Sequence, residues 1–292
     1  MSVCQLCPRN CRVDRSVSTG VCGAGAEIRI ARADLHFWEE PCISGTEGSG
    51  AVFFAGCNLH CVYCQNHAIS GGSVGKCVSV EALAETFLRL QEKKARNINL
   101  VTGTHYVPQI IEALDSARRQ GLWLPVVYNT SGYETEENIQ RLQGYVDVYL
   151  PDFKYVSEDL ALQFSHAKDY PEVARKALEA MVSQMERTTD RHGLTEDTPK
   201  VIVRHLVLPG HTSESKQVLS YLHETYGDRI HISIMSQYTP VVETPFAELN
   251  RRLTKREYAK VVDYALELGI TNAFIQEGEV AKESFIPEFM IE

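Results

Sequence analysis

Three cysteines within eight residues constrain this chain more than any other feature of its sequence. Cys57, Cys61 and Cys64 lie in the stretch CNLHCVYC, directly after the apolar run AVFFAG, which is typical of a buried strand. Cysteines at such short spacing are typical of metal ligands. A four-iron cluster takes one thiolate per iron, so three cysteines leave one iron with an open coordination position. An open position on a metal is typical of a catalytic site.

A zinc site is the alternative interpretation of this loop. Zinc in structural sites takes four ligands, and the fourth would be His60, His67 or Cys77. Zinc ligands usually come as separated pairs, whereas these three cysteines form one run. The spacing therefore favours an iron-sulfur cluster.

From residue 50 onward, short strand-like runs alternate with helical patterns, which predicts a parallel sheet with βαβ crossovers. Six or more such units favour a sheet that curls toward a barrel. The expected strands cover residues 51–56, 97–103, 123–131, 146–155, 201–209, 230–236 and 271–277. The expected helices cover 79–94, 106–121, about 135–143, about 157–190, 213–227 and 254–269. Thr254 and Glu257 fit a capping box, and Gly269 fits a helix C-terminus.

The first 48 residues differ from the rest in composition and periodicity, and we expect two domains. Residues 1–48 are rich in Cys, Gly and Arg and lack periodicity, which predicts a small metal-binding module ahead of a barrel over 49–292. Four cysteines from one short segment predict a closed site, either structural zinc or an auxiliary iron-sulfur cluster. These ligands are Cys4, Cys7, Cys11 and Cys22. Cys42 and Cys77 are left as ordinary thiols.

Composition excludes several classes of partner. The formal charge of -9 and the lack of a basic stripe argue against binding to nucleic acid or to anionic lipid. The N-terminus lacks the apolar region of a signal peptide, and no apolar run approaches the ~18 residues of a membrane helix, so we expect a cytoplasmic protein. In a reducing compartment, nine cysteines indicate metal sites rather than disulfides.

The stretch CNLHCVYC resembles the CxxxCxxC signature of the radical SAM superfamily, in which an aromatic residue such as Tyr63 often precedes the last cysteine. The similarity covers about residues 50–278 and is greatest to pyruvate formate-lyase activating enzyme-like proteins. It implies a partial (β/α)6 barrel, S-adenosylmethionine (SAM) bound to the open iron of a four-iron four-sulfur cluster, and a reduced flavodoxin or ferredoxin-type electron donor. It also implies cleavage of SAM to a 5'-deoxyadenosyl radical, which abstracts hydrogen from a small molecule or from a protein such as a glycyl radical enzyme.

One departure weakens the expectation of a glycyl radical enzyme as substrate. Glycyl radical activating enzymes with extra clusters carry the additional cysteines after the CxxxCxxC loop, whereas this chain carries them in front. We therefore leave the substrate open and assign no catalytic residue.

The resemblance also places SAM contacts at the C-terminal ends of the strands. Family members often have Gly-Gly-Glu after the second strand, where this chain has Thr102, Gly103, Thr104 and His105 and lacks the glutamate. Backbone carbonyls and the Thr104 hydroxyl are candidate acceptors for the SAM ammonium group, although Thr104 also fits a helix N-cap. Further candidates for SAM or substrate are Tyr63, Asn129, Thr130, Ser131, Asp152, Lys154 and Arg204.

Alternation along the strand sends Arg204 and His205 to opposite faces, and we expect Arg204 to point into the barrel. Its alternative role is an interior ion pair with Asp152 or Glu277, and His205 is expected to be a hydrogen-bonded core residue. The last two expected strands also carry polar residues at their C-terminal ends, namely Gln237, Tyr238, Gln276 and Glu277.

Two other function classes remain at this point. The chain would be a non-catalytic metal-binding or electron-transfer protein if His60, His67 or Cys77 supplied a fourth ligand. A zinc hydrolase is the third class.

Overall fold

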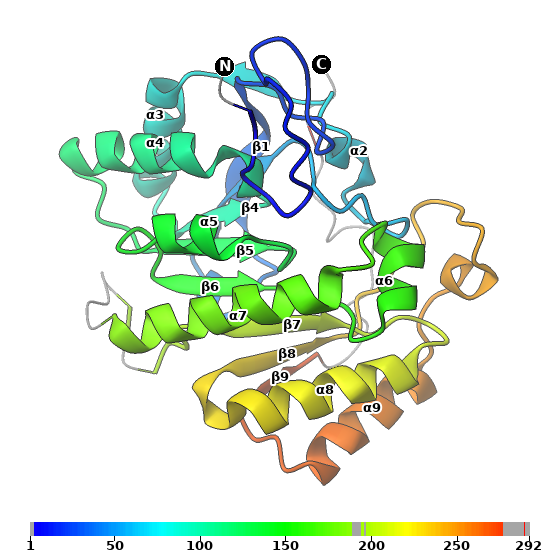
Figure 1. The fold of residues 1–292 in the computed structure, drawn as a ribbon. Coiled ribbons are helices and arrows are strands. Elements are labelled where there is room, and N and C mark those ends of the chain that lie inside the picture. Colours follow the sequence, from blue (N-terminus) through cyan, green and yellow to red (C-terminus); the bar gives the residue numbers. More distant parts are fainter. Residues whose placement is uncertain (1–2, 189–193, 196, 277–288, 290–292) are drawn as a thin grey trace.

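A computed structural model describes residues 3–188, 194–195, 197–276 and 289 (Figure 1). Seven parallel strands form its central wall, and all seven were expected from the sequence. They are β2 (Ser49–Phe54), β4 (Ile98–Val101), β5 (Val126–Thr130), β6 (Val148–Pro151), β7 (Ile202–Leu206), β8 (His231–Met235) and β9 (Ala273–Ile275). The first four pair in chain order and so do the last three, while single parallel bridges join β6 to β7. The expected partial barrel is confirmed.

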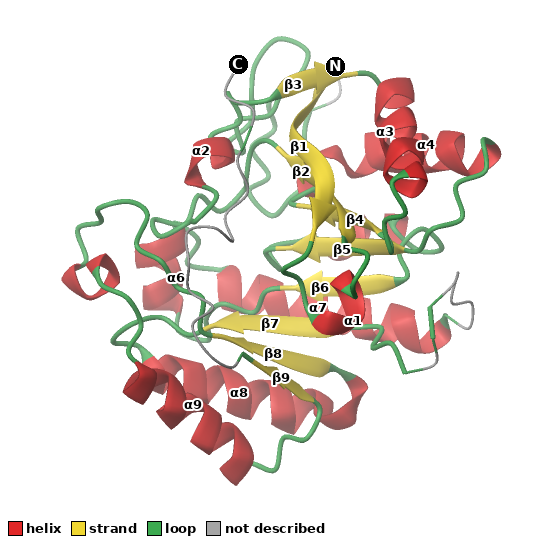
Figure 2. Ribbon diagram, turned by 180° about the vertical axis from the view of Figure 1, so that it is seen from behind, coloured by secondary structure: helices red, strands yellow, loops and turns green. Residues whose placement is uncertain are grey.

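The longer helices follow the strands and lie along the outer side of the wall (Figures 1 and 2). They are α3 (Val80–Glu92), α4 (Val107–Arg119), α5 (Glu136–Arg141), α6 (Glu158–Ser165), α7 (Tyr170–Arg187), α8 (Thr212–Tyr226) and α9 (Lys255–Glu267). The predicted capping box at Thr254 and Glu257 is present at the start of α9. No helix in the described part of the chain is long and apolar enough to span a bilayer.

The single helix expected at about 157–190 is wrong, because the structure has two. The helix α6 ends at Ser165, where His166 takes a left-handed conformation with φ of 52°, and α7 begins at Tyr170. Pro171 lies in the first turn of α7. A proline fits there because it has no N–H to donate, whereas inside a continuous helix it would remove a hydrogen bond.

The strand β1 (Ile28–His36) was not expected from the sequence. It pairs antiparallel with β2 and with the short strand β3 (Lys76–Val78), so it extends the wall beyond β2. The division of the chain at residue 48 stays a prediction, although β1 joins residues before that point to the barrel sheet.

Two short helices, each of four residues, complete the described helices. The helix α1 (Pro41–Ser44) sits on the inner side of the wall, near β6 and β7 in Figure 2, and Ile43 packs there with Val148 and Ile202. The helix α2 (His67–Ser70) follows the cysteine loop, and 3-10 turns cover Thr104–Tyr106, Gly227–Arg229 and Ala247–Asn250.

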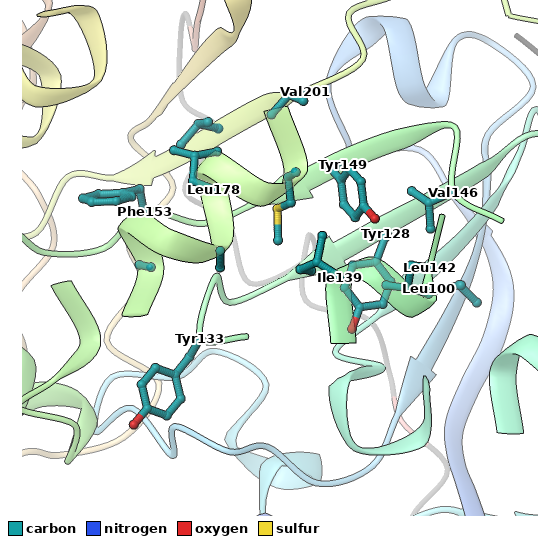
Figure 3. Packing of buried hydrophobic residues seen from close by; sticks show 14 of the residues in the cluster. Leu100, Tyr128, Tyr133, Ile139, Leu142, Val146, Tyr149, Phe153, Leu178 and Val201 are labelled. Atoms are coloured by element: carbon teal, nitrogen blue, oxygen red, sulfur yellow. The ribbon is translucent and has the colours of Figure 1, made fainter. Parts of the chain in front are cut away.

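The main apolar core lies between the wall and its helices. Figure 3 shows Tyr128 of β5 and Tyr149 of β6 beside Ile139 of α5, and the two tyrosine rings meet edge-on with centroids 6.1 Å apart. A buried aliphatic side chain such as that of Ile139 contributes roughly 1.5–3 kcal/mol of stability. This packing fixes the strand ends at which the polar residues lie.

Gly56 controls how the cysteine loop leaves β2. Its φ of +95° is left-handed, and a Cβ at this position would lie 2.6 Å from the carbonyl oxygen of Cys22. The next residue, Cys57, donates its backbone N–H to that same oxygen at 3.1 Å. Glycine is therefore required both by the backbone angle and by the close approach of the N-terminal segment.

We predict that Gly56→Ala destabilises the protein more than Gly144→Ala does. Gly144 also has positive φ, at +80°, but a Cβ there meets no atom within 4 Å. The free energy of unfolding of the control Gly144→Ala should fall by about 1–2 kcal/mol because of the backbone angle alone. That of Gly56→Ala should fall by at least about 1 kcal/mol more because of the steric clash. Urea unfolding measures both losses, and equal losses would contradict the close approach.

Candidate functional site

A cavity opens at the C-terminal ends of the parallel strands, where the sequence predicted the ligands to gather. We call it the cysteine cavity, because Cys57, Cys61 and Cys64 all line it. Seven of the nine predicted cofactor-binding residues line it too. They are Tyr63, Thr102, Asn129, Ser131, Asp152, Lys154 and Arg204. Thr130, Gln237 and Tyr238 are also in the lining, whereas Gln276 lies elsewhere and Glu277 is outside the described residues.

The three loop cysteines lie close enough to influence one another. Burial, together with the neighbouring Cys61 and Cys57, raises the pKa of Cys64 to about 12. The Cys61 sulfur lies 3.0 Å from the Ser165 hydroxyl oxygen at the end of α6. Three soft thiols facing one cavity fit a metal-sulfur group, since a bound cationic metal would replace their protons.

None of the candidates for a fourth ligand lines this cavity. The Nε2 atom of His60 lies 2.8 Å from the carbonyl oxygen of Val21, while His67 and Cys77 are exposed. Within the described ranges, no three His, Cys, Asp or Glu side chains are placed to close on a single metal ion. Among the described residues, the lining of the cavity holds three thiols, no fourth cysteine and no histidine, and its one carboxylate, Asp152, is paired with Lys154 and Arg204.

The four N-terminal cysteines also lie near one another. The sulfurs of Cys11 and Cys22 lie 3.3 and 3.4 Å from the point that a Cβ on Gly20 would occupy, and Cys4 lies close enough to Cys11 to lower its pKa. Burial raises the pKa of Cys7 to about 12. The proximity agrees with a common site and leaves its metal undecided.

Arg9 joins the N-terminal segment to the cysteine loop. Its side chain donates to the carbonyl oxygen of Asn58 at 2.7 Å and to that of Ser165 at 3.1 Å. The N-terminal cysteines therefore precede the main sequence motif in the chain but pack beside its loop in space.

A buried ion network forms one wall of the cysteine cavity. Arg204 pairs with Asp152 at 2.9 Å and with Glu39 at 3.3 Å, and Lys154 pairs with the other Asp152 oxygen at 2.7 Å. The predicted alternative of an Arg204–Asp152 pair is confirmed. Burial alone would raise the pKa of Asp152, but Lys154 and Arg204 outweigh it and hold that pKa below its ordinary value. Both cations remain fixed at the cavity.

The two residues of the Arg204–His205 pair face opposite ways, as the alternation predicted. His205 is buried and lies within hydrogen-bond distance of the Phe153 carbonyl and the Ser215 hydroxyl, at 2.8 and 2.9 Å. Burial lowers the pKa of His205 to about 4, so it is a neutral core residue at physiological pH.

Glu39 belongs to the site, although sequence reasoning missed it. It lies between β1 and α1, and its Oε1 accepts hydrogen bonds from the side-chain amides of Asn99 and Asn129 at 3.0 and 3.2 Å. Asn129 also accepts from Arg204 at 2.6 Å, so its side chain is held by the ion network. No local pattern marks Glu39, because its partners are far away in sequence.

Gly103 and Thr104 do not line the cysteine cavity, which corrects the expectation for Thr104. Its hydroxyl donates to Glu134 at 2.6 Å instead of facing a SAM ammonium group. It is not the N-cap of α4 either, because that position is Tyr106. Thr102 does line the cavity, with a left-handed φ of 59°.

Glu134 organises the polar interior behind this wall and was also missed. Its Oε1 accepts from the hydroxyls of Thr104 and Thr130, both at 2.6 Å, and of Tyr128 at 3.0 Å. Asn138 of α5 donates to Oε2 at 3.4 Å. These bonds join the ends of β4 and β5 to α5, so Glu134 supports the strand ends that carry the cavity residues.

The Glu134 network predicts a specific pH dependence. Burial raises the pKa of Glu134 above its ordinary value of 4.5, so the folded state holds the proton more tightly than the unfolded state. The stability that this proton contributes is present below about pH 4.5 and is lost as pH rises through the folded pKa. Glu134→Gln removes the titration, so the wild-type stability minus the variant stability should fall with increasing pH above 4.5.

Urea unfolding at a series of pH values measures this difference, and the exposed Glu136→Gln is the control for removing one carboxylate. A wild-type minus Glu134→Gln difference that stays constant or rises with pH would contradict the assignment.

Comparison with known proteins gives a family match over most of the barrel. Residues 51–222 match the model of the radical SAM superfamily, which covers the cysteine loop and four of the parallel strands that follow it. An uncharacterized protein of Methanocaldococcus jannaschii is 28% identical over 270 residues, which are 90% of this chain and 74% of that protein. The pyruvate formate-lyase-activating enzyme of Clostridium pasteurianum is 31% identical over 113 residues, 37% of this chain and 46% of that enzyme.

Among solved structures, SuiB of Streptococcus suis bound to S-adenosylmethionine is similar to this chain with a TM-score of 0.49 and 10% identity. The match covers 76% of this chain and 48% of SuiB, so the chain spans about half the length of that protein. The structure of SuiB bound to the precursor peptide SuiA matches with the same TM-score. The match of the family model to more than half of the sequence, with the CxxxCxxC loop at the strand ends, shows that the chain belongs to the radical SAM superfamily.

Proposed function

We propose that this protein is a radical SAM enzyme that holds a four-iron four-sulfur cluster through Cys57, Cys61 and Cys64. The observation that carries this proposal is that these three thiols line one cavity whose lining, among the described residues, holds no fourth cysteine and no histidine. The family implies both the cluster and SAM. When bound and reduced, that pair supplies a 5'-deoxyadenosyl radical that abstracts hydrogen from a substrate.

The chain's own contribution is to hold SAM and substrate in place. Thr102, Asn129, Thr130 and Ser131 offer short polar groups at neighbouring strand ends, which suit the SAM ammonium and ribose groups. Lys154 and Arg204 add fixed positive charge, which suits a carboxylate. Tyr63 is buried at the edge of the cavity, and its hydroxyl lies 2.6 Å from that of Tyr155.

The substrate stays open between a protein and a small molecule. Similarity to the pyruvate formate-lyase-activating enzyme supports a glycyl radical enzyme as substrate, but it covers only 37% of this chain. The N-terminal position of the extra cysteines argues in the other direction.

The proposal includes three further expectations from the sequence. Cys4, Cys7, Cys11 and Cys22 bind zinc or an auxiliary iron-sulfur cluster. A reduced flavodoxin or ferredoxin supplies the electron. The protein acts in the cytoplasm, as the lack of a signal-like or membrane-length apolar run suggests. It binds neither nucleic acid nor membrane, because the chain is acidic and has no basic stripe.

We predict that Cys61→Ala loses about four irons after anaerobic reconstitution and no longer cleaves SAM, while metal at the N-terminal site remains. Cys77→Ala is the matched control, because Cys77 is exposed on β3 and does not line the cysteine cavity. It should keep the full iron content and full SAM cleavage.

Iron, sulfide and zinc analysis, with chromatography of the SAM products, gives the readout. Unchanged iron content and turnover in Cys61→Ala would overturn the cluster assignment. Equal losses in both variants would instead indicate a four-ligand site that includes Cys77.

A further inference from the structure

A second cavity of about 390 Å³ adjoins the cysteine cavity. We call it the inner cavity. Arg204, Met235 and Gln237 line both cavities, so the two are neighbours. The remaining lining comes from β8, β9, Gln276 and residues 37–41, which lead from β1 to α1 on the inner side of the wall (Figure 2). Its volume lies within the range of about 300–1,000 Å³ that is usual for small-molecule sites.

Glu40 places a carboxylate without a full set of partners in this inner cavity. The residue is only 8% exposed, and among the described residues its Oε2 has no hydrogen-bond partner. Its neighbour Glu39 is different, because Asn99, Asn129 and Arg204 all donate to it. A buried carboxylate oxygen without a donor is costly, so Glu40 Oε2 marks a place where a donor is missing.

The ion pairs around the two cavities also leave Glu40 without a partner. Three carboxylates, those of Glu39, Glu40 and Asp152, face two cations, Lys154 and Arg204. Direct contacts pair the two cations with Asp152 and Glu39. Glu40 is the remaining carboxyl, without a direct ion-pair partner among the described residues, and burial raises its pKa. A cationic ligand group would supply the missing partner and stabilise the ionised form of Glu40.

The other lining residues of the inner cavity are largely apolar. Phe37 and Trp38 are 49% and 56% exposed, which places them at its mouth, while Met235 and Phe274 lie further along the wall. Apolar walls that end in a carboxylate suit an aliphatic stem with a charged tip.

We propose that the inner cavity binds a substrate through a primary ammonium or guanidinium group at the end of an aliphatic stem, with Glu40 as its acceptor. The role of this cavity as a substrate site rests on the function proposed above, whereas binding of the cation does not require the cluster. The shared residues Arg204, Met235 and Gln237 would bring the rest of such a molecule to the cysteine cavity, where hydrogen abstraction takes place.

Trp38 makes this binding measurable. The chain has two tryptophans, so Trp123→Phe leaves Trp38 as the single reporter at the mouth of the cavity. We would titrate this full-length protein, reconstituted anaerobically, with n-butylammonium, n-butylguanidinium and uncharged 1-butanol, and follow Trp38 fluorescence.

The expected result is saturable binding of at least one cation, at least tenfold tighter than that of 1-butanol. Glu40→Gln should weaken cation binding at least tenfold and leave the binding of 1-butanol unchanged. The control Glu47→Gln, an exposed glutamate just after α1, should bind as the parent does. Equal binding of the cations and 1-butanol by the parent protein would overturn the proposal without any need for a Glu40 variant, as would cation binding that Glu40→Gln does not weaken.

Two further experiments are needed. One distinguishes a lysine side chain of a protein from a free amine as the source of the cation, and the other distinguishes failure of this inference from failure of the proposed function. Tighter binding of N-acetyl-lysine amide than of n-butylammonium would identify a lysine side chain of a protein as the source, and the reverse order a free amine. The Cys61→Ala protein should bind the cation as well as the parent does. Cation binding by parent protein that carries a full cluster, binds SAM and still does not cleave it would sink the proposed function and leave this inference standing.

Discussion

The pairing of Arg204 inside the barrel is the interaction on which the site depends. A buried guanidinium is tolerated only when carboxylates and hydrogen-bond acceptors surround it. Here Asp152 comes from the end of β6, Asn129 from β5 and Glu39 from the segment after β1, and all three contact Arg204 of β7. Four separate parts of the chain therefore meet at one side chain. Removal of Arg204 would leave Glu39 buried without a cation and Asp152 with Lys154 alone.

The segment that carries Glu39 and Glu40 changes how the N-terminal part of the chain is understood. The sequence predicted a small separate module over residues 1–48, but β1 pairs with β2 and the residues after it enter the barrel. Arg9 contacts the cysteine loop as well. The N-terminal part thus supplies walls of the site in addition to four cysteines.

The sequence predicted the fold where the physical signal is periodic or local. All seven parallel strands follow from short apolar runs between helical patterns, and alternation along β7 placed Arg204 inward and His205 outward. The strand ends gathered Thr102, Asn129, Asp152 and the three loop cysteines at one cavity because parallel strands end at the same edge. The break between α6 and α7 was missed, since the helical pattern continues across it and only Pro171 marks a new start.

The rest of the site could not be predicted, because it depends on contacts between residues distant in sequence. Glu134 accepts a hydrogen bond from the hydroxyl of Thr104, which the sequence predicted to contact SAM. Glu39 accepts hydrogen bonds from Asn99 and Arg204, which are 60 and 165 residues away. A single glutamate carries no local signal for such contacts. Only the folded arrangement shows that Glu40 has a carboxylate oxygen left over.

The most direct test of the account is the formation of 5'-deoxyadenosine by anaerobically reconstituted protein supplied with dithionite and SAM. Because the three cysteines leave an iron open to SAM, deoxyadenosine and methionine should appear in equal amounts. Absence of deoxyadenosine from protein that carries a full four-iron cluster, with SAM shown to be bound, would contradict it.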